Sequence, residues 1–501
     1  MSNKNSNVWI GDKDLTRDES FIAISEQEFA DSSLLETLGN EEVAESSKGN
    51  RRDFLKFLGF GLGAATIAAG CDIPVKRALP YVVKPEEIIP GVANYYASTF
   101  VNGSDYAPIL VKTREARPIK VEGNAAMGQG GSSARAQASV LDLYDTNRYS
   151  KPYVKNDEAW DAISWADLDK SVMAKLAAAS NIRILTNTIM SPTTQAAVDA
   201  FTAKYPFTKI VMHDSVSYSG ILDANQSDFG DRSIPGYHFD KADVIVGFDA
   251  DFLGTLVSPT EFCQQYAVGR QVKDVKNPEI SKHIQVESGM SLTGSNADNR
   301  ILVKPSAMGE AIAYLYGKLV GGSASTKGLT DKARKALDKT SASLSVAKGK
   351  SLVVSGSNNP AEQMLVNGIN NALGNYGSTI DFGSAYLNRA GSDEDVADLV
   401  AEMKSGSVDA LIVMGTNPAY SYAAKTAFTE AMSKVTTKIS LAYAKDETTA
   451  LCDLIAPVHH SLESWGDVQA RRGIITMIQP TIQPLFNTRQ KEVSLMLWAG
   501  S

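Results

Sequence analysis

Short runs of β-branched and other apolar residues alternate along the chain with longer segments in which apolar residues recur every three or four positions. The first pattern is typical of buried strands and the second of helices that pack through one face. Strands are expected at 182–189, 209–214, 242–254, 283–288, 300–306, 350–360, 378–382, 409–418 and 438–444, and helices at 191–205, 306–320, 360–373, 393–406 and 421–433. Strands that are apolar on both faces and alternate with helices predict parallel sheets covered on both sides.

The order of these elements predicts an α/β protein with two doubly wound parallel-sheet halves. The first half covers residues 161–320 and the second residues 351–501, with the polar segment 321–350 as a helical linker between them. A smaller domain, residues 72–160, precedes the first half. Ligands of open parallel sheets bind beyond the carboxyl ends of the strands, so the loops that follow the strands are the expected ligand site. Their Gly, Asn and Pro residues are explained equally well by turn formation.

The segment before these domains reads NRRDFLKFLGFGLGAATIAAGCD, from Asn50 to Asp72. Its apolar run, Phe57–Ala69, is shorter than the roughly 20 residues that a membrane span needs. Positive charge lies only on its N-terminal side and small residues follow it, which is the order of an export signal. The paired arginines followed by DFLK resemble the twin-arginine signal, which a receptor reads. The residues of this signal are Arg51, Arg52, Phe54, Leu55 and Lys56.

Cys71 ends this segment after the small residues Ala68–Gly70, a pattern similar to the lipobox of bacterial lipoproteins. We therefore expect a signal over 51–71, with Cys71 as the lipid attachment site and the protein anchored on the periplasmic side of the inner membrane. The match has one departure, because Ala68 stands where a lipobox usually has Leu. A buried core helix is the alternative, but three alternating glycines in the run would each cost about 1 kcal/mol in a helix.

Charge is concentrated at the start of the chain. Residues 1–50 form an acidic extension with 11 acidic and 4 basic side chains, whereas the whole chain has a net charge of −8. The remainder is therefore close to neutral. A nucleic-acid binder normally carries a basic face, and outside the signal no cluster of Lys and Arg is dense enough to form one. No nucleic-acid partner is expected.

Cysteine and histidine are sparse. Three cysteines, Cys71, Cys263 and Cys452, lie too far apart for a disulfide framework. Iron–sulfur clusters generally take about four cysteines at close spacing, so no such cluster can be built from this chain alone. The histidines show no metal-ligand spacing, and the adjacent His459 and His460 would point to opposite faces of a strand.

Seven segments carry a resemblance to known proteins. They are ILVKTREARPIKVEGN (109–124), LYDTNRYSKPYV (143–154), ISWADLD (163–169), ADVIVGFDADFLGT (242–255), MSLTGSNAD (290–298), MGTNPAY (414–420) and CDLIAPVHHSLESWGD (452–467). In this order they are similar to segments of the molybdopterin oxidoreductase family. The acidic extension with Trp9, the late export signal and the segment PYVVKPEEIIPGVANYYAST (80–99) resemble a narrower group, the N-terminal half of the large peripheral subunit of bacterial alternative complex III.

The chain departs from the family where cofactors would be held. Active members usually open with a cysteine cluster whose last cysteine follows the VEGN segment, but AAMGQGGSSARAQAS (125–139) contains no cysteine. The family also has a Cys, selenocysteine, Ser or Asp ligand to molybdenum in the first α/β half. Asp251 and Ser258 are loop residues of suitable type that are better explained as cap or turn residues. In the alternative complex III group, the resemblance implies that this half lacks the molybdenum cofactor and that iron–sulfur clusters lie in a C-terminal half.

That half is missing after TRQKEVSLMLWAGS, whose apolar residues have nothing after them to bury them, so the sequence suggests a fragment or a split chain. The expected function is a non-catalytic scaffold of a respiratory quinol-oxidising complex, with no cofactor, metal or catalytic residue in this chain. The resemblance implies as partners a cluster-bearing C-terminal half or chain, integral membrane quinol-binding subunits, c-type cytochrome subunits with haem c, and a terminal oxidase as a further candidate.

We expect the former cofactor crevice to be filled by side chains such as Tyr144, Met290 and Met414. Two rival hypotheses stay open. One is an active molybdopterin-dependent reductase of the polysulfide or thiosulfate type. The other is a periplasmic lipoprotein that only binds a partner.

Overall fold

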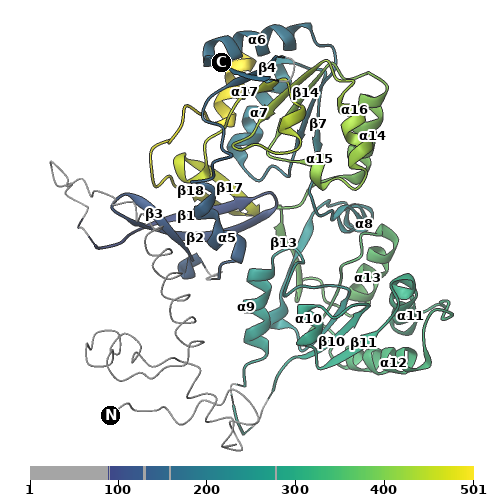
Figure 1. Cartoon of the computed structure of the whole chain (residues 1–501). Coiled ribbons are helices and arrows are strands. Elements are labelled where there is room, and N and C mark those ends of the chain that lie inside the picture. The colour runs from purple at the N-terminus through teal and green to yellow at the C-terminus, as the bar shows by residue number, and fades with distance from the viewer. Residues whose placement is uncertain are drawn as a thin grey trace, which may run out of the picture. The chain divides into compact units, whose positions relative to one another are not determined.

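The computed structural model describes residues 89, 91–127, 131–156, 159–272, 274–276 and 279–500. The chain divides into two compact units, Met1–Val83 and Lys84–Ser501, and the described residues belong to the second. The acidic extension, the export signal and Cys71 lie outside the described residues, so their assignment stays a prediction. The described unit contains four sheets and the helices that cover them (Figure 1).

The largest sheet combines strands from two distant parts of the chain. Its order is β5 (Ala159–Ala162), β4 (Tyr153–Asn156), β16 (Leu454–Ile455), β15 (Thr437–Leu441), β14 (Ala410–Met414), β6 (Ile182–Thr186) and β7 (Thr208–Met212). The strands β16, β15, β14, β6 and β7 run parallel, whereas β4 and β5 form an antiparallel edge. Along β14 the side chains alternate between two cores, with Leu411 in one and Ile412 in the other, as the two-residue period of a strand requires.

Helices cover both faces of this sheet. One face carries α6 (Trp165–Ala178), α7 (Pro192–Lys204) and α17 (Lys491–Ala499), and the other carries α14 (Asp393–Lys404) and α16 (Lys425–Met432), which the short α15 (Pro418–Ser421) precedes. In α17, Leu495 and Trp498 are buried, and Nε1 of Trp498 donates to Oδ1 of Asp169 in α6 at 2.8 Å. The expectation that the apolar residues of this last helix lack cover is wrong for these two, because preceding helices cover them, whereas Val493 and Leu497 are exposed.

A second, four-stranded sheet is parallel throughout. Its order is β11 (Asn299–Leu302), β10 (Lys282–Glu287), β9 (Val244–Phe248) and β12 (Ser351–Ser355). One face carries α11 (Met308–Leu319), α12 (Asp331–Val346) and α13 (Pro360–Ala372), and the other carries α8 (Ser219–Phe229) and α9 (Pro259–Gly269), while the short α10 (Leu292–Ser295) follows β10. Leu337 and Leu344 of α12 are fully buried in this core. The segment 321–350 therefore contributes a core helix rather than a free linker.

Two antiparallel sheets complete the described unit. One has the order β18 (Ile474–Ile478), β17 (Gly466–Arg471), β13 (Ile380–Tyr386) and β8 (Ile234–Tyr237). The other is the meander β1 (Asn94–Asn102), β2 (Asp105–Arg114) and β3 (Arg117–Gly123), which packs on α5 (Ala134–Asp142). Side chains of β1 bond the outer edge of β18, since Oγ1 of Thr99 donates to the carbonyl of Met477 at 3.0 Å.

The α/β fold class with parallel sheets is confirmed, but the sheets are not two consecutive halves of the chain. Strands β6 and β7, from the expected first half, pair with β14 and β15 from the second. Strand β12, from the second half, pairs instead with β9 of the first. Strands β4 and β5, placed in or next to the small domain, join the large sheet. The chain leaves the large sheet through β8 and returns through β13, and these two strands pair with each other.

Candidate functional site

The strand order of the large sheet reverses between β6 and β14. From β6 the chain moves outward to β7, whereas from β14 it moves in the opposite direction to β15 and β16. At such a reversal the helices that follow the two central strands lie on opposite faces, which leaves a crevice at the carboxyl ends of the strands. The first residues beyond these two strands are Asn187 and Gly415. Both line a cavity of about 290 Å³.

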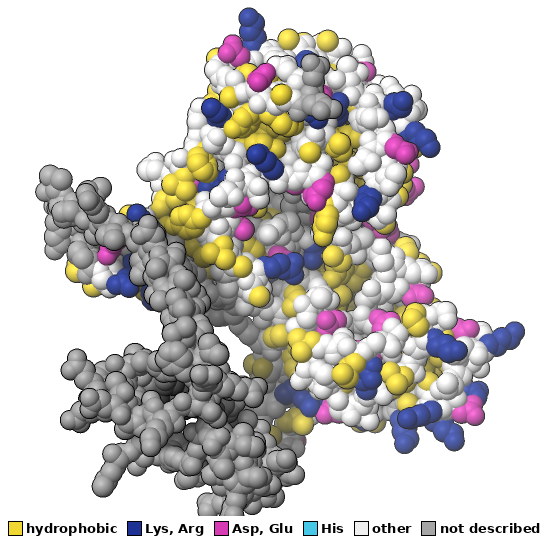
Figure 2. Space-filling view, viewed as in Figure 1, with side chains coloured by type: hydrophobic (Ala, Val, Ile, Leu, Met, Phe, Trp, Pro, Cys, Tyr) yellow, Lys and Arg dark blue, Asp and Glu magenta, His cyan; other side chains and the backbone are white. Residues whose placement is uncertain are grey.

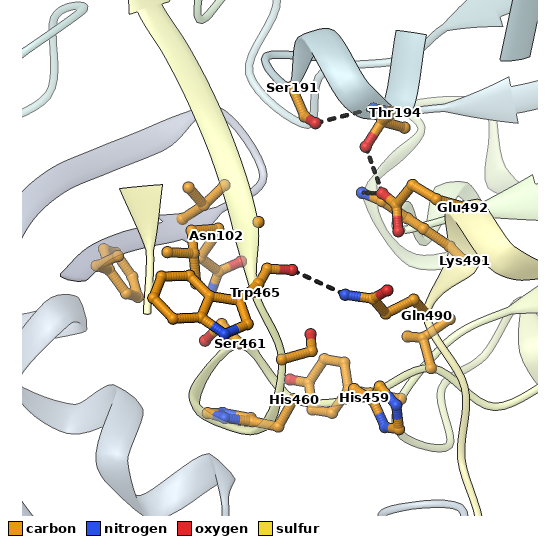
Figure 3. Close-up of a pocket in the computed structure, with 18 of the residues that line it drawn as sticks. Asn102, Ser191, Thr194, His459, His460, Ser461, Trp465, Gln490, Lys491 and Glu492 are labelled. Atoms are coloured by element: carbon orange, nitrogen blue, oxygen red, sulfur yellow. Dashed lines mark hydrogen bonds and ion pairs between the residues drawn. The ribbon is translucent and has the colours of Figure 1, made fainter. Parts of the chain in front are cut away.

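The cavity wall comes from segments that are far apart in the sequence. They include the β1–β2 turn at Asn102 and Gly103, the end of α5, the start of α7, the segment 458–466 that contains the short helix η6 (Ser461–Glu463), the start of β17, and the start of α17. Figure 3 shows Trp465 and Gln490 facing each other across the site, where Nε2 of Gln490 donates to the carbonyl of Trp465 at 2.9 Å. The β1–β2 turn is fixed to the sheet because Nδ2 of Asn187 donates to the carbonyl of Gly103 at 3.2 Å.

The N-terminus of α7 already holds a carboxylate. Ser191 caps the helix by accepting from the amide of Thr194 at 2.9 Å. Asp467 of β17 accepts from the hydroxyl of Ser191, from the amide of Thr193 at 3.2 Å and from its hydroxyl at 2.8 Å. A helix N-terminus attracts anions, and here a side chain of the protein itself takes that place.

The start of α17 adds one ammonium group and one carboxylate. Lys491 lies 3.8 Å from Glu492, and Glu492 accepts from the hydroxyl of Thr194 at 2.5 Å (Figure 3). The charged side chains in the cavity wall are therefore three carboxylates, Asp142, Asp467 and Glu492, and one ammonium, Lys491. This wall favours a cationic or neutral ligand over an anionic one.

Two histidines complete the wall without adding charge. Burial, with a contribution from the Arg148 guanidinium, lowers the pKa of His460 to about 4. Burial also lowers the pKa of His459. Nδ1 of His460 accepts from the amide of Leu462 at 3.1 Å, as only the neutral ring can. Both imidazoles are therefore neutral at pH 7.

A buried ion pair supports this wall from behind. Arg148 binds Glu463 through both terminal nitrogens, at 3.0 and 2.6 Å, and both side chains are fully buried. Burial alone would raise the pKa of the Glu463 carboxyl, but hydrogen bonds from Arg148 and from the amides of His460 and Leu485 lower it. The pair thus fixes the loop that carries the two histidines.

The second sheet has its own reversal, between β9 and β12. There the loops meet backbone to backbone, since a Cβ added to Gly356 would lie 2.3 Å from the carbonyl oxygen of Asp249. The start of α8 closes on the same region, because a Cβ on Gly220 would lie 2.3 Å from the carbonyl oxygen of Asn358. Protein backbone therefore fills this edge of the sheet.

The residues singled out in the sequence do not form one site. Asp251 is a turn residue, as expected, since its carbonyl accepts from the amide of Gly254 at 3.1 Å. Its Oδ1 also accepts from the amide and hydroxyl of Thr293 at 3.0 and 2.7 Å. Ser258 stands at the N-cap position of α9 without a side-chain cap hydrogen bond. Neither residue lines the 290 Å³ cavity.

The expectation that Tyr144, Met290 and Met414 fill a common crevice is wrong. Tyr144 and Met290 are 54% and 74% exposed, whereas Met414 is buried in the core of the large sheet. The reason is that Met414 points inward from the last position of β14 and Met290 stands in a surface loop after β10. The residues that line the cavity at α17 were missed, although the polar run RQKE at the start of that helix was a usable signal.

The two described cysteines are free thiols that do not pair. Cys452 is buried, and its Sγ donates to the carbonyl of Thr448 at 3.4 Å. In the part of the chain that the structure describes, no group of three or more His, Cys, Asp and Glu side chains could hold a metal ion. Among the same residues, no helix has the length and apolar character of a membrane span.

Comparison with known proteins gives two informative similarities. The chain is 25% identical over 517 aligned positions to the molybdopterin-binding-like subunit of menaquinone reductase from Nitratidesulfovibrio vulgaris, covering 90% of this chain and 72% of that protein. Its structure is similar to acetylene hydratase from Pelobacter acetylenicus, with a TM-score of 0.59 at 10% identity over 80% of this chain and 69% of that chain. The latter likeness concerns the fold alone. No protein-family model matches the chain.

The name of the relative agrees with the molybdopterin oxidoreductase resemblance seen in the sequence, and the likeness to acetylene hydratase agrees with it in fold. The pterin cofactor of this superfamily is bulky and dinucleotide-like, and its pyrophosphate needs cationic or amide donors. The wall of the cavity at the large sheet carries one ammonium group and three carboxylates. One of these carboxylates, Asp467, already accepts from the Thr193 amide at the start of α7. Its volume of about 290 Å³ is at the low end of small-ligand pockets, about 300–1,000 Å³. The residues that line this cavity do not fit the superfamily's cofactor.

Proposed function

We propose that this chain is a non-catalytic scaffold subunit of a quinone-linked electron-transfer complex, of the alternative complex III kind. The proposal rests on the two strand-order reversals, where the superfamily's ligands would bind, because neither offers a site suited to the cofactor. One is lined by an excess of carboxylates, and backbone contacts close the other. The name of the relative, a molybdopterin-binding-like subunit of a menaquinone reductase, supports the link to quinone chemistry.

The proposed role of the fold is to hold partner subunits. Hydrophobic side chains gather over β17 and β18 on the face shown in Figure 2. Three of them, Ile474, Ile475 and Met477, are 47%, 57% and 53% exposed on the edge strand β18, and Trp465 near the start of β17 is 57% exposed. Exposed apolar patches of this kind mark protein contacts. The proposed partners are a cluster-bearing chain or half, membrane quinol-binding subunits and c-type cytochrome subunits.

We further propose that the protein is exported through its twin-arginine segment and held at the periplasmic side of the inner membrane by lipid on Cys71. Replacing Arg51 and Arg52 by Lys keeps the charge but removes the planar guanidinium groups, and should leave the protein in the cytoplasmic fraction. Export of this variant at the normal level would contradict the signal. Mass spectrometry of the mature N-terminal peptide should find an acylated Cys71, and an unmodified peptide beginning upstream of Cys71 would rule out the anchor.

Affinity purification of the native complex tests the scaffold role. A tagged chain from detergent-solubilised membranes should copurify with subunits that carry haem and iron–sulfur clusters. Ile475→Asp should reduce this copurification at least fivefold without changing the circular dichroism of the chain. Val346→Asp is the matched control, because Val346 is 91% exposed on the distant helix α12. Recovery of the wild-type chain alone, with no redox subunit, would favour the simple lipoprotein and contradict the proposal.

A further inference from the structure

Arg389 is a buried cation without an anionic partner among the described residues. It stands in the loop between β13 and α14 and is 6% exposed. In the described part of the chain, one other arginine, Arg148, is buried to this degree, and it forms the bidentate pair with Glu463. The Arg389 guanidinium forms no ion pair or hydrogen bond with described residues, and its Nε is buried without an acceptor.

The acidic side chains of the neighbouring loops are already engaged. Asp214 accepts from the hydroxyl of Thr188 at 2.9 and 2.8 Å and from the amide of Gly391 at 3.1 Å. Asp393 accepts from the hydroxyl of Ser217 at 2.7 Å and from the Asn358 amide group at 3.0 Å. These contacts position the loop, and the two carboxylates form no ion pair with Arg389.

Arg389 and the preceding Asn388 both contact the segment that leads into α9. The Arg389 guanidinium lies 4.9 Å from the centre of the Tyr218 ring, and the Tyr218 hydroxyl accepts from the amide of Val257 at 3.1 Å. Nδ2 of Asn388 donates to the carbonyl of Ser104 at 2.9 Å and to that of Val257 at 3.4 Å. Oδ1 of Asn388 is buried without a donor. The Nε–H of Arg389 and the Oδ1 of Asn388 are therefore unpaired, one donor and one acceptor on consecutive residues.

A buried guanidinium in this position needs an anion. Arginine does not lose its proton in proteins, and a charge that is buried without a partner is strongly destabilising. Its planar set of N–H donors matches the oxygen atoms of a phosphate or carboxylate. The unpaired amide oxygen of the preceding residue, Asn388, calls for a ligand that can also donate a hydrogen bond.

We propose that Arg389 is the centre of a binding site for a small oxyanion that carries a proton, with hydrogen phosphate as the model ligand. Phosphate oxygens accept from the Arg389 guanidinium, and the phosphate hydroxyl donates to Oδ1 of Asn388. The ligand is small because only 6% of Arg389 is exposed. This inference is independent of the scaffold role and of the cavity at the large sheet, whose wall does not include Arg389.

Calorimetric titration of the full-length chain with inorganic phosphate at pH 7, at constant ionic strength set by chloride, tests the site. We expect saturable binding with one phosphate per chain and a matching rise in Tm. Arg389→Gln should abolish both effects. Arg334→Gln is the matched control, since Arg334 pairs with Asp331 on the outer face of α12, and it should bind phosphate as the wild type does. Wild-type protein without measurable phosphate binding, or Arg389→Gln with unchanged binding, would overturn the proposal.

Two further measurements separate a ligand site from a structural role. In phosphate-free buffer, Arg389→Gln should unfold at the wild-type Tm or above it, because the substitution removes an uncompensated charge. A marked loss of Tm in that buffer would show that the side chain serves the fold and would overturn the proposal. Sulfate, which carries no proton at pH 7, should bind at least tenfold more weakly than phosphate. Equal binding of the two anions would overturn the role given to Asn388.

Discussion

The Arg148–Glu463 pair joins three segments at the wall of the cavity in the large sheet. Besides the two bonds between the side chains, Arg148 donates to the carbonyl of Leu143 at 2.9 Å, and Glu463 accepts from the amide of Leu485 at 3.1 Å. The sequence offered no sign of this pair, because its members lie 315 positions apart and each is an ordinary charged residue in its local segment. Such long-range pairs depend on the folded topology and cannot be derived from local patterns.

Removing the charge of one member of this pair should lower the free energy of unfolding. Glu463→Gln leaves the Arg148 guanidinium buried without its counter-charge, and we expect a loss of about 3–5 kcal/mol in the free energy of unfolding, measured by urea denaturation. The double variant Arg148→Met, Glu463→Gln should recover part of that loss, because it removes the buried charge and Gln keeps a carbonyl acceptor for the backbone amides of His460 and Leu485. Asp338→Asn is the control, because the Lys318–Asp338 pair is exposed and exposed ion pairs contribute little to stability. A loss in Glu463→Gln no larger than in this control would contradict the structural role of the pair.

The buried His460 makes stability depend on pH. Burial lowers its pKa in the folded protein from 6.5 to about 4, so the folded state favours the neutral ring. The resulting stabilisation is fully present above pH 6.5 and is lost as the pH falls towards 4. It amounts to about 3 kcal/mol.

His460→Asn isolates this effect, because Asn keeps a cap acceptor for the amide of Leu462 but does not titrate. The Tm of this variant minus that of the wild type should rise as the pH is lowered from 7 to 4.5. A difference that stays constant over this range would show that His460 does not contribute to the acid sensitivity.

At the scale of elements, local signals were sufficient for most strands and helices of the parallel sheets. The helix expected at 191–205 is observed as α7, and Ser191 caps it. Local signals could not tell which strands pair, because every buried strand shows the same apolar run. The mixed origin of the large sheet, with β6 beside β14, is set by packing between distant segments. The cavity at the strand-order reversal of this sheet results from that pairing. The sequence predicted only that the loops after the strands would form a ligand site.

The closed edge of the second sheet leads to a prediction for α8. Replacing a helical glycine by alanine normally stabilises a protein by about 1 kcal/mol. In Gly220→Ala the new methyl group would meet the backbone of Asn358, and the forced shift should destabilise the protein by about 1–3 kcal/mol. Gly289→Ala is the control, since nothing lies within 4 Å of its added Cβ, and it should be close to neutral in thermal unfolding. A stabilised Gly220→Ala variant would mean that this edge is open.

At the scale of the whole molecule, the fold class followed from the alternation of strands and helices, whereas the consequences for cofactors required the structure. The sequence showed that the cysteine cluster is missing at 125–139. It did not show that Asp467 occupies the start of α7 or that backbone contacts close the second sheet. These two features, together with the missing cysteines, disfavour binding of the cofactor.

Elemental analysis of the purified full-length chain tests the central proposal most directly. The chain should be expressed in a host that synthesises the molybdenum cofactor and analysed for molybdenum and tungsten by mass spectrometry, with an active enzyme of the superfamily purified in parallel as a positive control. The scaffold account predicts less than about one tenth of a metal atom per chain, because the carboxylate-rich cavity and the closed second edge cannot hold the pterin. Near-stoichiometric molybdenum or tungsten would contradict the account and establish the reductase alternative.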